Sequence, residues 1–230
     1  MNRPDTQSDH WHVLGAGAMG CLFAAALRTS GQGVSLLLRN EARLQMLERN
    51  GGIGMASASG ASLQTIAAAT IDAAGPPIHR LLVTTKAYQA SDAVTAIAPR
   101  LSDQAVVVLL HNGMGVYEEI KQRFPGTQLV TGVTTEGANQ LSPFNVLHAG
   151  RGHTWLGRRD GARNPSLVES LQAAGFATSW DAQIEERLLH KLGINCCINP
   201  LTVIHGCVNG DLLDGGEREL AMEELADEGS

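Results

Sequence analysis

Short apolar runs alternate with amphipathic segments along the first 135 residues of the chain. The continuous runs suit buried strands, and the segments between them place apolar residues at helical spacing. This pattern predicts strands at residues 12–14, 34–38, 81–85, 106–110 and 129–135, with a weaker or edge strand at 66–70. It predicts helices at residues 21–27, 41–49 and around 91–101. Strands that alternate with helices in this way indicate an α/β fold with a parallel, doubly wound sheet.

The pattern changes in the second half of the chain. Residues 145–156 alternate around a turn at 150–152, which predicts an antiparallel extension of the sheet, and residues 166–174 read as one more amphipathic helix. A long apolar helix begins near Ile184, so we expect a first domain at residues 1–182 and the start of an all-helical second domain at 183–230. A piece of about 50 residues rarely holds its own core. We therefore expect the second domain to be docked as an appendage, completed by another chain, or truncated.

A G-x-G-x-x-G motif follows the first predicted strand and opens the first predicted helix, formed by Gly15, Ala16, Gly17, Ala18, Met19 and Gly20. In that context the motif is typical of a Rossmann-like dinucleotide-binding fold. The first glycine permits a tight turn, the second lets the backbone approach a pyrophosphate, and the third allows close helix packing. The amino terminus of the helix offers free N–H groups to the phosphates. The alternative is a tight strand-to-helix turn that binds nothing.

The residue after the second predicted strand indicates which dinucleotide is bound. An NAD site places an acidic residue there to hold the ribose hydroxyls, but this strand ends in Leu38, Arg39 and Asn40. A guanidinium can hold the oxygens of a 2′-phosphate in two parallel hydrogen bonds. The sequence therefore predicts NADPH as the cofactor, with Arg39 at its 2′-phosphate. The alternative is that Arg39 is a solvated strand-end residue and Glu41 holds the ribose.

The long apolar helix carries a row of polar residues. Lys191, Asn195 and Asn199 stand four residues apart, so they share one slanting stripe of the helix. Burying an amide without partners costs roughly 1–3 kcal/mol, so partners or a ligand should line that stripe. The stripe suits a substrate-facing wall whose lysine donates a proton to a developing alkoxide. The alternative is that the asparagines bond to other helices while the lysine reaches water.

Two loops directly follow predicted strands, so we expect them at the carboxyl ends of the parallel strands, where such sheets bind ligands. The first is TTKAYQ at residues 84–89, and the second is HNGMG at residues 111–115. Their glycines and amides suit close approach to a cofactor and a substrate. Lys86 could equally be a solvated loop cation, and Asn112 could serve only as a turn residue.

Composition and charge exclude several other classes of protein. The formal net charge of −6 and the isoelectric point near 5.7 argue against a nucleic-acid partner. The sequence predicts neither a membrane span nor a signal peptide, so a cytoplasmic protein with a small-molecule partner is expected. Cys21, Cys196, Cys197 and Cys207 lack zinc-finger spacing and are expected to be reduced. We expect no metal site, and His148 and His153 to be structural or exposed.

These motifs together resemble the ketopantoate reductase (2-dehydropantoate 2-reductase) family. They are GAGAMG, TTKAYQ, HNGMG and the segment KLGINCCINPLTVIHGCVNGDLL at residues 191–213. The resemblance implies NADPH-dependent reduction of 2-dehydropantoate to pantoate in pantothenate and coenzyme A biosynthesis. It implies that Lys191 donates the proton, that Asn195, Asn199 and Asn209 bind the substrate, and that Asn112 lies between substrate and cofactor. It also implies that Lys86 lies near NADPH and that Ala138 contacts NADPH from a turn at residues 134–138.

The family also supplies a serine for the substrate carboxylate and a glutamate near the lysine, both from later helices than this chain contains. Three readings therefore stay open. The first is a reductase of 2-dehydropantoate. The second is a catalytically impaired dinucleotide-binding fragment of such an enzyme, and the third is a related 2-keto acid reductase. An apolar face left uncovered in the second domain predicts a homodimer or poor solubility.

Overall fold

A computed structural model describes residues 9–58, 60–110 and 115–205 of the 230-residue chain. The chain divides into two compact units, residues 1–184 and residues 185–230. In the part that the structure describes, no helix is both long and apolar enough to cross a bilayer.

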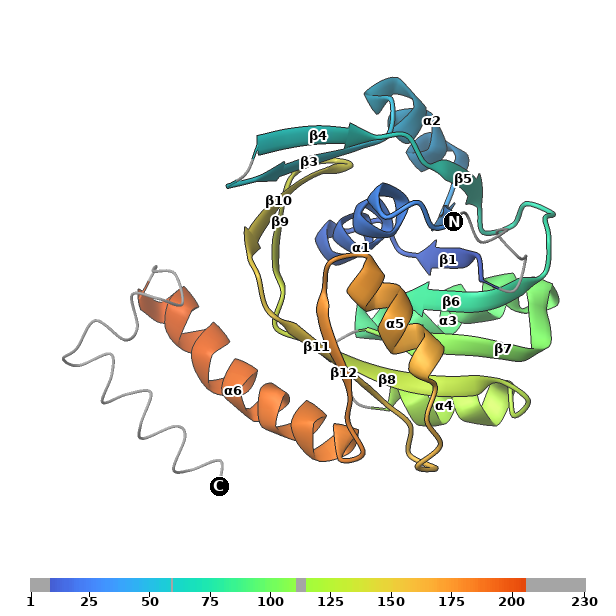
Figure 1. Cartoon of the computed structure of the whole chain (residues 1–230), viewed down its shortest axis with the longest axis vertical. Helices are drawn as coiled ribbons and strands as arrows, with labels where there is room; N and C mark the ends of the chain where they lie inside the picture. The colour runs from blue at the N-terminus through green and yellow to red at the C-terminus, as the bar shows by residue number, and fades with distance from the viewer. Residues whose placement is uncertain (1–8, 59, 111–114, 206–230) are drawn as a thin grey trace. The chain divides into compact units, whose positions relative to one another are not determined.

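The first unit is built on an eight-stranded sheet with the strand order β12-β11-β8-β7-β6-β1-β2-β5 (Figure 1). Its six parallel strands are β1 (Trp11–Leu14), β2 (Val34–Leu38), β5 (Ala67–Thr70), β6 (Ile78–Val83), β7 (Leu101–Leu109) and β8 (Gln128–Thr134). When these six strands are numbered 1 to 6 along the chain, they lie side by side in the order 3-2-1-4-5-6, which is the order of a Rossmann sheet. The remaining strands are β11 (His153–Gly157), antiparallel to β8, and β12 (Ala177–Trp180), parallel to β11. The order of strands reverses between β1 and β6, which is where such sheets bind ligands.

Helices cover both faces of this sheet because its central strands are apolar on both sides. One face packs against α1 (Ala18–Thr29) and α5 (Pro165–Ala173), in a core that includes Trp11, Phe23 and Leu171. The indole N–H of Trp11 donates to Ser170 Oγ at 2.8 Å, which fixes α5 on the sheet. The other face packs against α3 (Ala87–Ile97) and α4 (Val116–Arg123), and the short 3-10 helix η1 (Ala98–Arg100) follows α3 directly.

A second sheet curls around α1 on the side away from the main sheet (Figure 1). Its strand order is β4-β3-β10-β9, with β3 (Ile53–Ser57), β4 (Gly60–Gln64), β9 (Gly137–Ser142) and β10 (Asn145–Gly150). Helix α2 (Glu41–Asn50) precedes β3 and is capped by Asn40, whose side chain accepts from the backbone N–H of Arg43. Phe144, between β9 and β10, is fully buried against this side of α1.

The predicted α/β class and doubly wound sheet are confirmed, and residues 67–70 form an edge strand as expected. The antiparallel extension is half right. Residues 153–157 join the main sheet antiparallel to β8, but residues 145–150 pair with β9 and β3 in the second sheet. The pattern of apolar residues did not predict β3, β4, β9, β12 and α4. Strand β4 is mostly exposed, so it lacks the buried alternation that identifies a strand.

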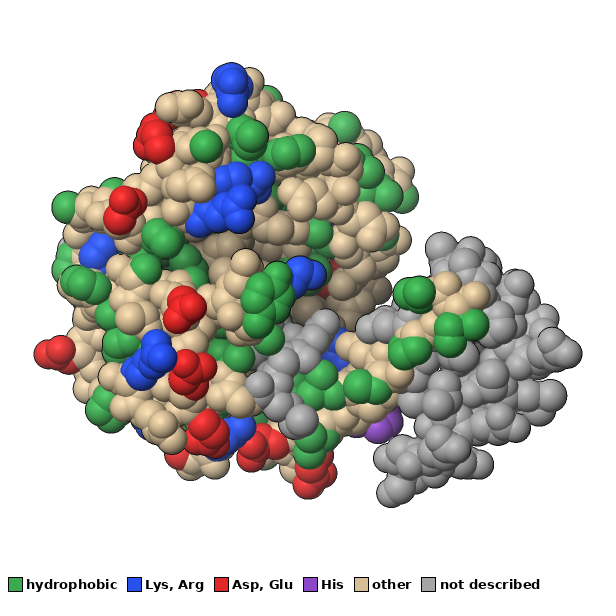
Figure 2. Space-filling view, turned by 180° about the vertical axis from the view of Figure 1, so that it is seen from behind, with side chains coloured by type: hydrophobic (Ala, Val, Ile, Leu, Met, Phe, Trp, Pro, Cys, Tyr) green, Lys and Arg blue, Asp and Glu red, His purple; other side chains and the backbone are tan. Residues whose placement is uncertain are grey.

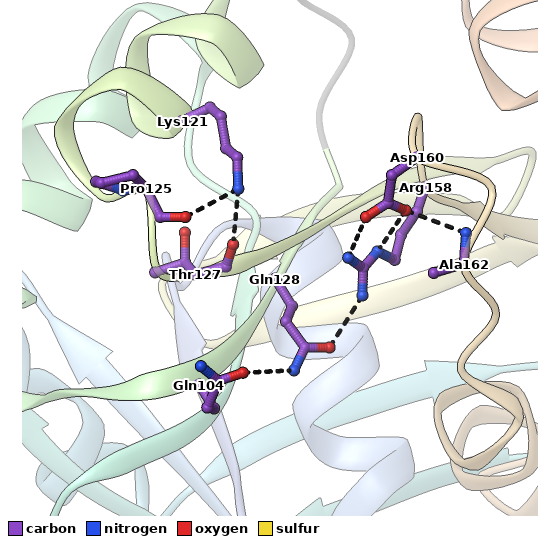
Figure 3. A network of polar contacts seen from close by, with 8 residues as sticks. All are labelled: Gln104, Lys121, Pro125, Thr127, Gln128, Arg158, Asp160 and Ala162. Atoms are coloured by element: carbon purple, nitrogen blue, oxygen red, sulfur yellow. Dashed lines mark hydrogen bonds and ion pairs between the residues drawn. The ribbon is translucent and has the colours of Figure 1, made fainter.

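A polar network joins the amino-terminal ends of β7 and β8 to the turn after β11 (Figure 3). Arg158 pairs with Asp160, and its Nη1 donates to Gln128 Oε1 at 3.0 Å. Gln128 Nε2 in turn donates to Gln104 Oε1 at 3.4 Å, and Lys121 Nζ donates to two carbonyl oxygens of the turn before β8. The network therefore fixes the side of the sheet at which the parallel strands begin, opposite to their carboxyl ends.

The described part of the second unit belongs to one helix, α6 (Ile184–His205). It passes through Lys191 and Asn195 without interruption and contains Pro200. Several of its apolar side chains are exposed, namely Leu189, Ile194, Val203 and Ile204.

Candidate functional site

A cleft of about 760 Å³ lies where β1, β2 and β6 end, at the point where the strand order reverses. Backbone from the glycine motif forms part of its wall, and the loop after β6 forms another part. In Figure 2 a group of blue basic side chains borders a hollow on the face turned to the viewer. The residues that line the cleft are Leu14, Gly15, Ala16, Gly17, Leu37, Leu38, Arg39, Arg43, Ile71, Thr84, Thr85, Lys86, Tyr88, Gln89, Asp92, Ala93 and Gln140.

The three glycines of the motif differ in what their surroundings allow. Gly15 has a φ of +106°, and an added Cβ would lie 2.9 Å from the backbone nitrogen of Thr85. An added Cβ at Gly20 would overlap the carbonyl oxygen of Gly15. At Gly17, by contrast, an added Cβ meets nothing within 4 Å. Packing therefore requires Gly15 and Gly20, whereas Gly17 leaves open space at the first turn of α1.

The end of β6 holds the glycine loop in place. Thr84 donates its backbone N–H to the carbonyl of Leu14 at 2.9 Å, and its hydroxyl donates to the carbonyl of Gly15 at 2.8 Å. The next residues, Thr85 and Lys86, line the cleft, and Lys86 is the N-cap of α3. Helix α3 therefore begins directly at the cleft, four residues earlier than the sequence predicts.

Two arginines line the cleft beyond the glycine loop. Arg39 follows β2 directly and is exposed, as its position in the sequence predicts. Arg43 lies in the first turn of α2 and donates from Nη2 to the carbonyl of Ala16 at 3.1 Å. Sequence reasoning missed Arg43. The available signal was its spacing of four residues from Arg39 at the start of a predicted helix.

Other predicted site residues lie outside the lining of this cleft. Ala18 and Met19 are partly buried and pack against the core, and Gly20 is buried beneath the loop. Ala138 lies in strand β9 rather than in a turn, because β9 already begins at Gly137 to pair with β10. It packs against the core, and Gln140, two residues further along β9, lines the cleft instead. Asn112 and Asn209 lie outside the described residues.

Helix α6 carries the predicted polar stripe. Lys191 and Asn195 are one helical turn apart and half-buried. Asn199 lies one turn further along the same helix. Burial lowers the pKa of Lys191 from its usual value, because removal from water disfavours the charged ammonium. A lysine with a lowered pKa can act as an acid nearer neutral pH.

Four titratable groups of the first unit, Cys21, His12, His148 and His153, lie outside the lining of the cleft. Burial raises the pKa of the Cys21 thiol to about 12, although Arg43 acts in the opposite direction, so the thiol stays protonated. Burial lowers the pKa of His12 to about 4, so its imidazole is neutral. His148 Nε2 lies 2.7 Å from a Glu136 carboxylate oxygen, and His153 Nε2 lies 2.8 Å from Ser179 Oγ. Both imidazoles therefore have a polar partner within the first unit.

The fold and the cleft define the class of protein. A sheet ordered 3-2-1-4-5-6, with a glycine-rich turn and a helix amino terminus at its switch point, belongs to the Rossmann class of α/β proteins. The sequence profile described as "Ketopantoate reductase PanE/ApbA" matches residues 11–161, and its companion "Ketopantoate reductase PanE/ApbA C terminal" matches residues 183–230. The chain belongs to the ketopantoate reductase family.

Curated relatives agree with this assignment. The chain is 32% identical over 203 residues to the 2-dehydropantoate 2-reductase of Vibrio cholerae, covering 87% of this chain and 65% of that protein. It is 30% identical over 220 residues to the 2-dehydropantoate 2-reductase of Archaeoglobus fulgidus, covering 94% of this chain and 71% of that protein. The chain thus spans about two thirds of the length of these relatives.

Solved structures share the fold. The PanE/ApbA family ketopantoate reductase from Ralstonia eutropha superposes with a TM-score of 0.82 at 24% identity, covering 96% of this chain and 72% of that one. D-mandelate dehydrogenase, solved with NADH and anilino(oxo)acetate, superposes with a TM-score of 0.83 at 18% identity, covering 95% of this chain and 78% of that one. At these identities the likeness supports the fold alone.

Gly17 and Gly20, the second and third glycines of the motif, give a matched test of its packing. Gly20→Ala should lower the free energy of unfolding by about 1–3 kcal/mol, because the new methyl group overlaps backbone that cannot move aside. Gly17→Ala should lower it by less than about 1 kcal/mol, since the added methyl enters open space and only the helix cap changes. Urea unfolding of both variants measures the difference. Equal losses would contradict the close contact between Gly20 and Gly15.

Proposed function

We propose that the cleft binds NADPH and that the chain carries the cofactor half of a 2-dehydropantoate 2-reductase. The observation that carries the cofactor choice is Arg39 at the end of β2, lining the same cleft as the glycine loop. The open space at Gly17 and the amino terminus of α1 suit a pyrophosphate, so the residues present fit a dinucleotide. Arg39 would hold the 2′-phosphate, and Lys86, at the N-cap of α3, would add positive charge near the phosphates.

The rest of the motif and Ala138 have supporting roles in this proposal. Gly15 and Gly20 would shape the loop, and Ala16, Ala18 and Met19 would contribute backbone at the phosphates. Ala138 would contact the cofactor from β9, the strand that also brings Gln140 to the cleft. We propose residues 1–182 as the cofactor domain and residues 183–230 as the start of the substrate domain.

The substrate side of the proposal rests on family membership. NADPH, when bound, supplies the hydride for the keto carbon. Lys191 would donate a proton to the oxygen of that carbon, which accumulates negative charge as the hydride arrives. Asn195, Asn199 and Asn209 would hold the substrate through their amides, and Asn112 would lie between substrate and cofactor. The product would be pantoate, which places the reaction in pantothenate and coenzyme A biosynthesis, in the cytoplasm.

A second candidate is a fragment that binds NADPH without turning over substrate. It is favoured because the residues that line the cleft all belong to the first unit. A third is reduction of a related 2-keto acid, and a panel of such acids separates it from the first. A homodimer is a further proposal, since Leu189 and Val203 of α6 are 54% and 81% exposed and exposed apolar surface favours association.

Arg39→Asp tests the choice of cofactor. It should weaken NADPH binding by roughly ten- to a hundredfold, because it removes a charge-assisted contact to the phosphate and places a like charge beside it. NADH binding should change far less, since NADH lacks the 2′-phosphate. Titration of the purified variant with each dinucleotide measures both affinities. Equal losses for the two cofactors would contradict the assignment of Arg39 to the phosphate.

Lys191→Ala tests the proton donor. Turnover of 2-dehydropantoate should fall by roughly 10²- to 10⁴-fold while NADPH affinity stays unchanged, because the glycine loop and Arg39 are untouched. In the unsubstituted protein, kcat should fall as the pH rises through the lowered pKa of Lys191, since only the protonated ammonium can donate. Both are followed by the loss of NADPH absorbance. Undiminished turnover in the variant would remove Lys191 from the acid role.

A further inference from the structure

Arg43 connects three parts of the first unit through its backbone and its guanidinium. Its backbone is fixed at the start of α2, where its N–H donates to the Oδ1 of the capping Asn40 at 3.1 Å. Its Nη2 donates to the carbonyl of Ala16 in the glycine loop at 3.1 Å. Its Cζ lies 4.3 Å from the centre of the Phe144 ring, in the turn between β9 and β10. The side chain therefore ties the glycine loop to α2 and to the second sheet.

The aromatic side of this contact is rigid. Phe144 is fully buried, and its carbonyl accepts from the backbone N–H of Gly54 at 2.9 Å. A guanidinium that lies over a fixed ring is restrained by the cation–π attraction, so its N–H groups have less freedom to turn away. Among the described residues, no carboxylate forms an ion pair with Arg43. Its positive charge is therefore left to act on the loop and the cleft.

The bond to Ala16 sets the orientation of one peptide group. Because a peptide is planar and trans, its C=O and N–H point in opposite directions. Arg43 holds the carbonyl of Ala16, so it also fixes the direction of the N–H of Gly17. Gly17 is the N-cap of α1 and lines the cleft, with open space beside it. A loop held in this way keeps its donor oriented before any ligand arrives.

We propose that Arg43 is a positioning residue that preorganises the glycine loop for the pyrophosphate of a dinucleotide. This inference rests on the proposed binding of a dinucleotide in the cleft. It differs from the role of Arg39, because the pyrophosphate is common to NADPH and NADH whereas the 2′-phosphate is not. Arg43 should thus contribute to the affinity for both cofactors by the same factor, and Arg39 to the affinity for NADPH alone.

Arg43→Met and Arg43→Lys, made in the full 230-residue chain, separate positioning from simple charge. Methionine keeps an apolar stem on the Phe144 ring but removes the donor, and lysine keeps the charge but loses the planar fork. Both variants should weaken NADPH and NADH by about tenfold each, leaving the ratio of the two affinities unchanged. Arg49→Met is the matched control, because Arg49 lies exposed on the same helix and outside the cleft. It should leave both affinities unchanged.

Hydrogen exchange of the loop amides in the cofactor-free protein gives a second readout. Arg43→Met should speed exchange across residues 15–20, whereas Arg49→Met should not. A loss confined to NADPH, full rescue by lysine, or unchanged binding and exchange would each overturn the proposal. If the unsubstituted chain binds neither dinucleotide, the proposed function fails. The exchange measurement still decides whether Arg43 holds the loop in that case.

Discussion

The close contact between Gly20 and the carbonyl of Gly15 is the constraint on which the site depends. It lets α1 begin directly above the end of β1, and no side chain larger than hydrogen fits between them. Thr84 completes the contact from β6 by donating to the same carbonyl. Because three elements meet at this carbonyl, the backbone of the loop is fixed before any ligand binds. A preorganised loop loses less conformational entropy on binding than a mobile one.

The sheet order then decides which side chains share the cleft. Strands β2 and β6 flank β1, so the residues that follow them, Arg39 and Lys86, lie on either side of the glycine loop. The second sheet adds a further constraint, since its β9–β10 turn presents Phe144 to Arg43. The cleft is thus assembled from segments as far apart in sequence as Leu14 and Gln140, and parallel pairing brings most of them together.

Much of this arrangement could be predicted from the sequence, because buried parallel strands read as continuous apolar runs and the glycine motif has a fixed context. The second sheet could not be predicted from the sequence. Strand β4 is exposed along most of its length and β9 is exposed over its last four residues, so neither shows a buried face in the sequence. The role of Arg43 was equally hidden, because it depends on Phe144, a partner about 100 residues away that only the folded chain brings near. By contrast, Arg39 was predictable, since its position follows directly from the end of β2.

The central claim is that the cleft at the switch point of the sheet binds a dinucleotide. Isothermal titration of NADPH into the purified 230-residue chain tests it most directly, because the lining of the cleft comes from the first unit and the measurement needs no turnover. We expect saturable binding with one cofactor per chain, and tighter binding of NADPH than of NADH. Absence of binding by a chain shown to be folded would contradict it.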